Sequence, residues 1–67
     1  MSKRRQDLDR RLNAIEAKVP GLLQRPDTFP RAFEDEVEVL LGQIVVQDHA
    51  YALERLEAIV DRSGFNG

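Results

Sequence analysis

The sequence predicts an all-α protein, and three observations lead to that prediction. Apolar residues recur at spacings of three and four within three separate segments, which is the pattern of helices that bury one face. All three prolines lie between positions 20 and 30, so the strongest helix breakers separate the first segment from the other two. The 67 residues are 42% apolar and 33% charged, a balance typical of small globular domains rather than of disordered chains.

We expect one domain, residues 1–67, that forms a small three-helix bundle. The alternative is a helical hairpin, in which the second and third segments form one long kinked helix. A chain of this length buries only about 60% of its unfolded surface, so its core is marginal. The sequence has no cysteine and therefore no disulfide. We expect homo-oligomerisation, as a homodimer, to complete the fold.

The first predicted helix covers about residues 4–18. Its apolar side chains form a narrow row with spacings of 4, 3 and 4, namely Leu8, Leu12, Ile15 and Val19. Ser2 suits the N-cap position. Pro20 and Gly21 are expected to end the helix, because the residue before a proline is disfavoured in the α region.

The prolines predict a connector over residues 20–29. Because Leu22 and Leu23 lie inside this segment, we expect it to be an ordered loop that is anchored to the core. Its role is to reverse the direction of the chain between the first two helices.

The second predicted helix covers about residues 30–46. Thr28 or Asp27 is expected to cap it, and Pro30 falls in the first turn, where the missing N–H costs no hydrogen bond. Its broad apolar stripe consists of Phe33, Val37, Leu40, Leu41, Ile44 and Val45.

The stripe of the second helix loses its phase near residue 47, because its continuation would bring charged residues inward. A break there, with Asp48 as N-cap, gives a third helix over about residues 49–62. Its apolar residues lie on a different face and are Ala52, Leu53, Leu56, Ile59 and Val60. Ser63-Gly64 is expected to stop this helix, and residues 63–67 form a short C-terminal tail.

A β-hairpin over residues 36–47 is the alternative to the second helix. Apolar and acidic residues partly alternate there, and Gly42-Gln43 suits a two-residue turn. We favour the helix, because a lone two-stranded hairpin is only marginally stable and the helical spacing accounts for more of the apolar residues.

Charge is distributed unevenly along the chain. Residues 1–31 carry eight Lys/Arg and four Asp/Glu, whereas residues 32–67 carry two and eight. The cations predicted to make electrostatic or nucleic-acid contacts are Arg4, Arg5, Arg10, Arg11 and Lys18. These cations suit three roles: a solvated face, phosphate binding, or pairing with an acidic protein surface that includes the acidic half of this chain.

Little in the sequence supports catalysis. His49 is the only histidine, and its helical neighbours are apolar, so no metal site is predicted. The acidic run at positions 34–38 lacks the glycine and distal glutamate of a calcium-binding loop. The sequence also holds no cysteine nucleophile and no glycine-rich phosphate loop. We predict a protein that is not an enzyme and needs no cofactor.

The predicted function is a regulatory protein–protein interaction module, such as a small adaptor, a chaperone-like subunit or an inhibitor of a larger assembly. The predicted partner-binding residues are on the last helix: Tyr51, Leu53, Leu56, Ile59 and Val60. The same residues also suit closure of the bundle. The alternative function is a small nucleic-acid-binding regulator that uses the basic first helix. No apolar run is long enough to span a membrane, and we expect a cytoplasmic protein.

Overall fold

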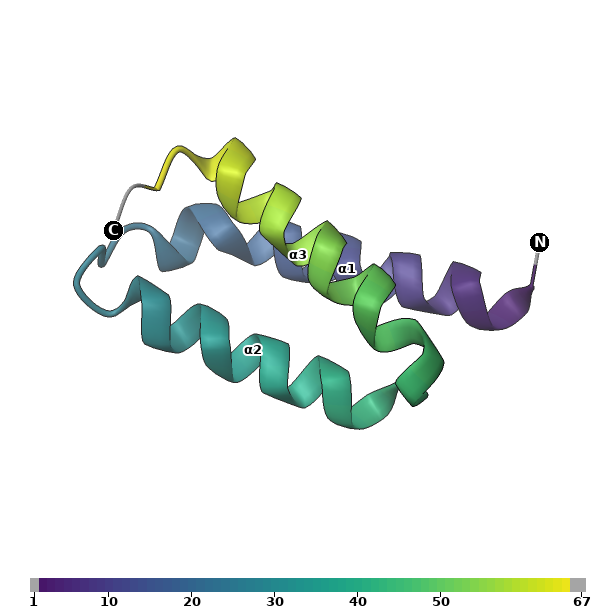
Figure 1. Ribbon diagram of the computed structural model, residues 1–67. Helices are drawn as coiled ribbons and strands as arrows, with labels where there is room; N and C mark the ends of the chain where they lie inside the picture. Colours follow the sequence, from purple (N-terminus) through teal and green to yellow (C-terminus); the bar gives the residue numbers. More distant parts are fainter. Residues whose placement is uncertain (1, 66–67) are drawn as a thin grey trace.

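The computed structural model describes residues 2–65, which contain three α-helices and no strand: α1 (Lys3–Leu22), α2 (Phe29–Gln43) and α3 (His49–Ser63). A short 3-10 turn, Val46–Asp48, precedes α3. Helix α2 runs back along α1, and α3 returns in the direction of α1 (Figure 1). The bundle measures 36 × 19 × 16 Å. The prediction of an all-α, three-helix architecture is confirmed.

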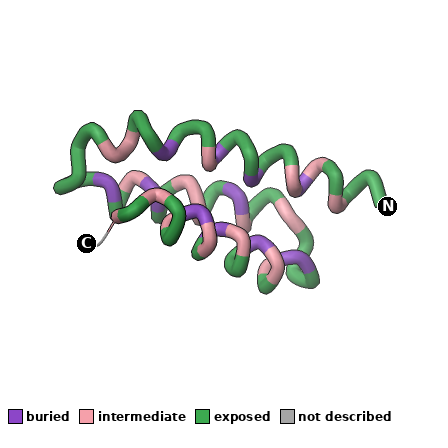
Figure 2. The backbone as a smooth tube through the Cα atoms, turned by 90° about the horizontal axis from the view of Figure 1, so that it is seen from above, coloured by how far each residue is buried: buried purple, intermediate pink, exposed green. Residues whose placement is uncertain are grey.

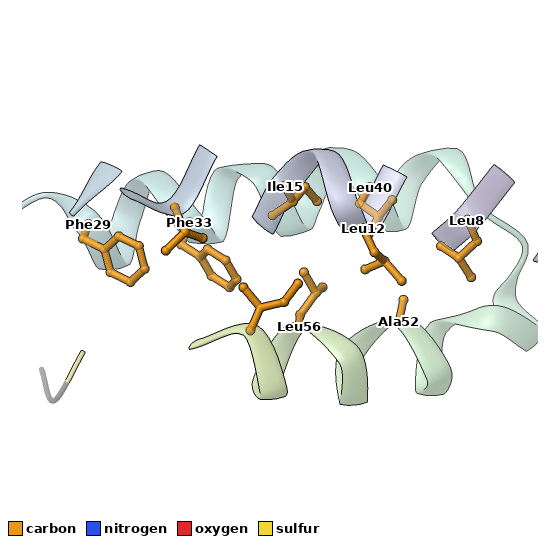
Figure 3. Packing of buried hydrophobic residues seen from close by; sticks show 10 residues of the cluster. Leu8, Leu12, Ile15, Phe29, Phe33, Leu40, Ala52 and Leu56 are labelled. Carbon is orange, nitrogen blue, oxygen red and sulfur yellow. The ribbon is translucent and has the colours of Figure 1, made fainter. Parts of the chain in front are cut away.

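The core follows one row of side chains on α1. All four residues of the predicted row are buried, and buried positions recur along the inner side of each helix (Figure 2). Opposite this row lie three residues from each of the other helices (Figure 3): Phe29, Phe33 and Leu40 of α2, and Ala52, Leu56 and Ile59 of α3. Leu22 and Leu23 pack against this core, as expected for the anchored connector.

Helix α1 continues through Pro20, so the prediction that it ends there is wrong. The amide of Leu23 donates to the carbonyl of Val19, which keeps the residue before the proline helical. Val19 is 5% exposed, and its burial contributes about 2 kcal/mol against the cost of about 3 kcal/mol for a proline inside a helix. Pro20 itself lies on the exposed side of α1. The connector therefore shortens to residues 23–28.

Thr28 occupies the N-cap position of α2, as predicted, but its side chain makes no capping hydrogen bond, and the helix ends at Gln43 instead of residue 46. Ile44 and Val45 are extended, with ψ angles of 159° and 153°. Gly42 weakens the last turn, and the β-branched residues that follow disfavour a helix. These extended residues separate α2 from α3, so the structure contains neither one kinked helix nor a hairpin in this segment. Val45 is 41% exposed and does not belong to the buried stripe.

Asp48 precedes α3 as predicted, but its side chain makes no capping hydrogen bond. The carboxylate instead turns inward and is only 1% exposed, because two arginines of α1 pair with it. Helix α3 ends one residue later than predicted, and Gly64 stops it in the left-handed conformation with φ 79°.

An aromatic cluster closes the end of the bundle beside the connector. The ring of Phe29 lies 5.6 Å from that of Phe33 and 4.7 Å from that of Phe65. The predicted tail therefore contributes Phe65 to the core, while residues 66–67 lie outside the described part of the chain. Phe29 lies four positions before Phe33 and continues the predicted stripe, although it precedes the predicted start of the helix, whereas Phe65 falls outside the periodic rows.

Replacement of Leu56 by Ala is expected to destabilise the fold by about 2–5 kcal/mol, because Leu56 is 3% exposed and its loss leaves a cavity. The matched control is Leu53→Ala on the same helix, since Leu53 is 44% exposed and is expected to cost less than about 1 kcal/mol. Urea unfolding followed by circular dichroism measures both values. Equal losses for the two variants would contradict the assignment of the α3 core face.

Candidate functional site

The structure places the five residues predicted to bind a partner in three different environments. Leu56 and Ile59 lie in the core, so they close the bundle and offer no surface to a partner. Val60 is half-buried and packs against the same core. Tyr51 joins a polar network between α1 and α3, and only Leu53 is exposed. The face predicted for a partner is therefore mainly an internal face of the bundle.

Three cations of α1 that are spaced by seven positions, Arg4, Arg11 and Lys18, lie along α2, and each meets a polar partner. Arg11 Nη1 donates to Gln43 Oε1 at 2.6 Å, and Lys18 Nζ donates to Glu36 Oε1 at 2.6 Å. The third member, Arg4, reaches Asp48 just beyond the end of α2. From the Arg11–Gln43 pair to the Lys18–Glu36 pair, the residue number rises by seven on α1 and falls by seven on α2. This is the register of antiparallel helices.

Acidic residues on the other flank of α1 pair with α3. Asp9 Oδ1 accepts from Arg55 Nη1 at 3.2 Å, and Glu16 Oε2 lies 2.8 Å from Arg62 Nη2. Here an increase of seven on α1 corresponds to an increase of seven on α3, which is the register of parallel helices. These contacts direct cations of α1 toward α2 and acids of α1 toward α3, with Arg5 as an exception, because its guanidinium lies over the ring of Tyr51 of α3.

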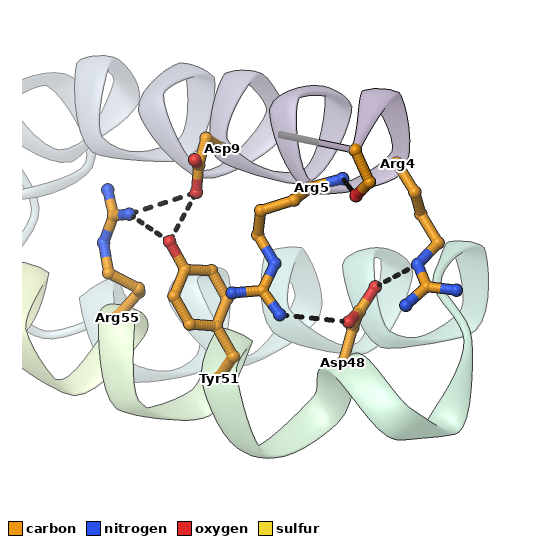
Figure 4. A network of polar contacts seen from close by, with 7 residues as sticks. Arg4, Arg5, Asp9, Asp48, Tyr51 and Arg55 are labelled. Carbon is orange, nitrogen blue, oxygen red and sulfur yellow. Dashed lines mark hydrogen bonds and ion pairs between the residues drawn. The ribbon is translucent and has the colours of Figure 1, made fainter.

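Asp48 is the only buried charged residue among positions 2–65, and it ties the first turn of α1 to the start of α3 (Figure 4). Arg5 Nη2 donates to Asp48 Oδ1 at 3.5 Å, and Arg4 Nε lies 3.1 Å from Oδ2. The second contact is an ion pair without hydrogen-bond geometry, so Oδ2 accepts no hydrogen bond from the described residues. Both arginines are partly exposed, so the contact spans the boundary between core and solvent.

The ring of Tyr51 extends this network along α1. The guanidinium of Arg5 lies 3.9 Å from the ring centroid, close enough for a cation–π contact. Tyr51 Oη donates to Asp9 Oδ1 at 2.6 Å and accepts from Arg55 Nη1 at 2.8 Å. This arrangement fixes the lateral position of α3 on α1, and the polar atoms of Tyr51, Asp9 and Arg55 bond one another.

Three of the five predicted contact cations thus pair with carboxylates from the acidic half of the chain: Arg4, Arg5 and Lys18. Arg10 is an exposed residue 3.7 Å from Asp7 on its own helix. The unevenness of charge along the sequence is therefore offset in part inside the folded chain.

A hollowed surface remains between α1 and α2. The polar contact of Arg11 with Gln43 divides it into two depressions, both of which these two residues line. Core residues form the apolar floor of the depressions: Leu8, Ile15 and Leu40. Val39 and Val45 line one depression each and are 58% and 41% exposed. We call this surface, bounded by Arg4, Ala14, Lys18, Glu36, Val39 and Val45, the α1–α2 face.

The α1–α2 face was not predicted from the sequence, although Val39 carries a signal for it. On a helix, Val39 falls outside the stripe formed by Phe33, Val37 and Leu40, so a helical α2 must expose it. Val39 instead fits the apolar pattern of the β-hairpin alternative. For that reason the sequence does not single it out as an apolar side chain that a helix would expose.

His49 has a structural contact and no visible metal-ligand set. Its Nε2 lies 3.0 Å from the carbonyl oxygen of Leu41, one of the last carbonyls of α2. No group of three potential metal-ligating side chains occurs within residues 2–65. In the same range, no helix has the length and apolar character needed to cross a bilayer.

Comparisons of the chain with known protein families, with curated proteins and with solved structures gave no match. The assignment of a function therefore rests on the geometry of the chain itself.

The double substitution Arg4→Ala/Arg5→Ala is expected to lower the free energy of unfolding by about 1–3 kcal/mol, because it leaves a buried carboxylate without a cation. Arg10→Ala/Arg11→Ala is the control, since it removes the same charge from α1 without touching Asp48. Urea unfolding compares the two, and addition of Asp48→Asn should recover part of the loss. A loss no greater than that of the control would show that the Asp48 contacts do not stabilise the fold.

Proposed function

We propose that this protein is a non-enzymatic protein-interaction module that binds its partner through the α1–α2 face. Small adaptors and small subunits of larger assemblies are the classes that fit such a module. The proposal differs from the sequence-based prediction in the location of the contact surface, because the apolar face of α3 is occupied by the core.

The distribution of exposed apolar side chains is the observation that carries this proposal. Four large apolar residues are exposed among positions 2–65: Val39, Val45, Val46 and Leu53. Val39 and Val45 line the α1–α2 face, and Val46 follows Val45 directly. Single exposed apolar residues are common on protein surfaces, whereas a group of them beside an apolar hollow is typical of an interaction surface.

Charge pairing within the chain weighs against the nucleic-acid alternative. Affinity for phosphates depends on clustered cations that can release counterions. Arg4, Arg5 and Lys18 are each held by a carboxylate of the same chain, so phosphate binding must displace these contacts.

A tagged chain is expected to capture a partner protein from lysate of its host in the presence of nuclease. Val39→Asp places a charge on the α1–α2 face and is expected to abolish the capture, while Leu53→Asp on α3 is expected to retain it. Both residues are exposed, so the fold tolerates both substitutions. Mass spectrometry identifies and quantifies the bound protein.

Two outcomes would contradict the proposal. Capture that disappears on nuclease treatment would favour the basic flank of α1 as a nucleic-acid surface. Equal capture by Val39→Asp and by the unmodified chain would show that another surface makes the contact.

A further inference from the structure

We propose that the α1–α2 face binds a second copy of this chain, with α1 of each copy packed against α2 of the other. The result is a four-helix core related by a two-fold axis parallel to these helices. This inference rests on the proposed function and names the partner of that same face.

Both helices carry a row of exposed residues on the side that faces away from the core row. On α1 the row has spacings of 4, 3 and 4 and consists of Arg10, Ala14, Ala17 and Gly21. On α2 it has spacings of 4 and 3 and consists of Asp35, Val39 and Gly42. Alternating spacings of three and four are the pattern with which one helix packs on another at a shallow angle. These rows place the small residues of α1 and Val39 of α2 on the same exposed side of the helix pair.

The shapes of the two rows are complementary. Ala14, Ala17 and Gly21 are small, and a Cβ added to Gly21 meets no atom within 4 Å, so α1 presents a shallow surface. Val39 projects from α2, with more than half of its side chain exposed. A two-fold interface must be complementary to itself, and this condition is met when the projecting row of one copy faces the shallow row of the other.

Charge selects the same arrangement. The exposed side of α1 carries Arg10 and Arg11, which have no carboxylate partner on another helix, and the exposed side of α2 carries three acids without an ion-pair partner among the described residues: Glu34, Asp35 and Glu38. Packing of α1 on α1, or of α2 on α2, places like charges together. Only α1 against α2 brings opposite charges together, and like-charge contacts disfavour the other arrangements.

The contacts within one chain fix the register across the interface. Arg11 lies beside Gln43 and Lys18 beside Glu36, so residues of α1 and α2 are level when their numbers add to about 54. A two-fold axis parallel to the helices keeps every residue at its own level. Ala14 and Ala17 of one copy therefore face the partner's Val39, and Lys18 lies close to the partner's Asp35.

Sedimentation of the purified chain over a concentration series tests the proposal. The unmodified protein is expected to reach twice the 7.7 kDa mass of one chain. Val39→Asp is expected to weaken the association at least about 10-fold, whereas Leu53→Asp is expected to leave it unchanged. Circular dichroism of each variant verifies that the helices remain folded.

Cysteine cross-linking tests the arrangement of the helices, because the chain has no cysteine of its own. A tagged Ala14→Cys chain mixed with an untagged Val39→Cys chain is expected to form a mixed disulfide under mild oxidation. Glu54→Cys, on the exposed side of α3, replaces Val39→Cys in the control mixture and is expected to cross-link far less.

Three results would overturn the proposal: a chain that stays monomeric at about 1 mM, a Val39→Asp variant that associates as the unmodified chain does, and equal cross-linking in both mixtures. A monomeric chain that still captures another protein through Val39 would overturn only the self-association, and the proposed function would stand. Absence of both self-association and capture would overturn both.

Discussion

The whole structure depends on one constraint: α1 has to pack against two neighbouring helices with a single narrow row of apolar side chains. Leu8, Leu12, Ile15 and Val19 are buried beneath α2 and α3 together. Burial of this row is not directional, so it does not decide which neighbour lies on which side. The charged flanks decide that. Cations on one flank meet α2, acids on the other meet α3, and the opposite numbering of the two sets of pairs gives the two helices opposite directions.

This use of charge changes the meaning of the uneven charge distribution. In sequence, the basic first half suggests a surface for phosphates or for an acidic partner. In the fold, much of that charge is directed to residues of the same chain. Individual exposed ion pairs contribute only about 0–1 kcal/mol, so they specify the arrangement of the helices more than they stabilise it. What remains available for other molecules includes the α1–α2 face, where the exposed side chains of Val39 and Val45 lie among charged residues.

The fold class, the number of helices and the core row of α1 could be predicted from the sequence, because they depend on periodicity that is local. The predictions that were wrong concern residues whose role is set by distant parts of the chain. Asp48 has the local chemistry of a helix cap, yet two arginines more than 40 positions away draw it inward. Pro20 has the local chemistry of a helix end, yet burial of Val19 favours continuation. Leu56 and Ile59, two of the residues predicted to bind a partner, lie in the core, because periodicity does not tell whether an apolar face packs inside the bundle or against another molecule.

The pairing of residues seven positions apart limits how this fold can change in length. Insertion of a single residue between Arg11 and Lys18 turns the rest of α1 by about 100°, which separates Lys18 from Glu36 and Glu16 from Arg62 together. Insertion of seven residues turns the rest of the helix by only about 20° from its starting orientation. Each flank of α1 therefore still faces the same neighbouring helix. Longer relatives of this bundle are therefore expected to grow by two helical turns at a time, in all three helices at once.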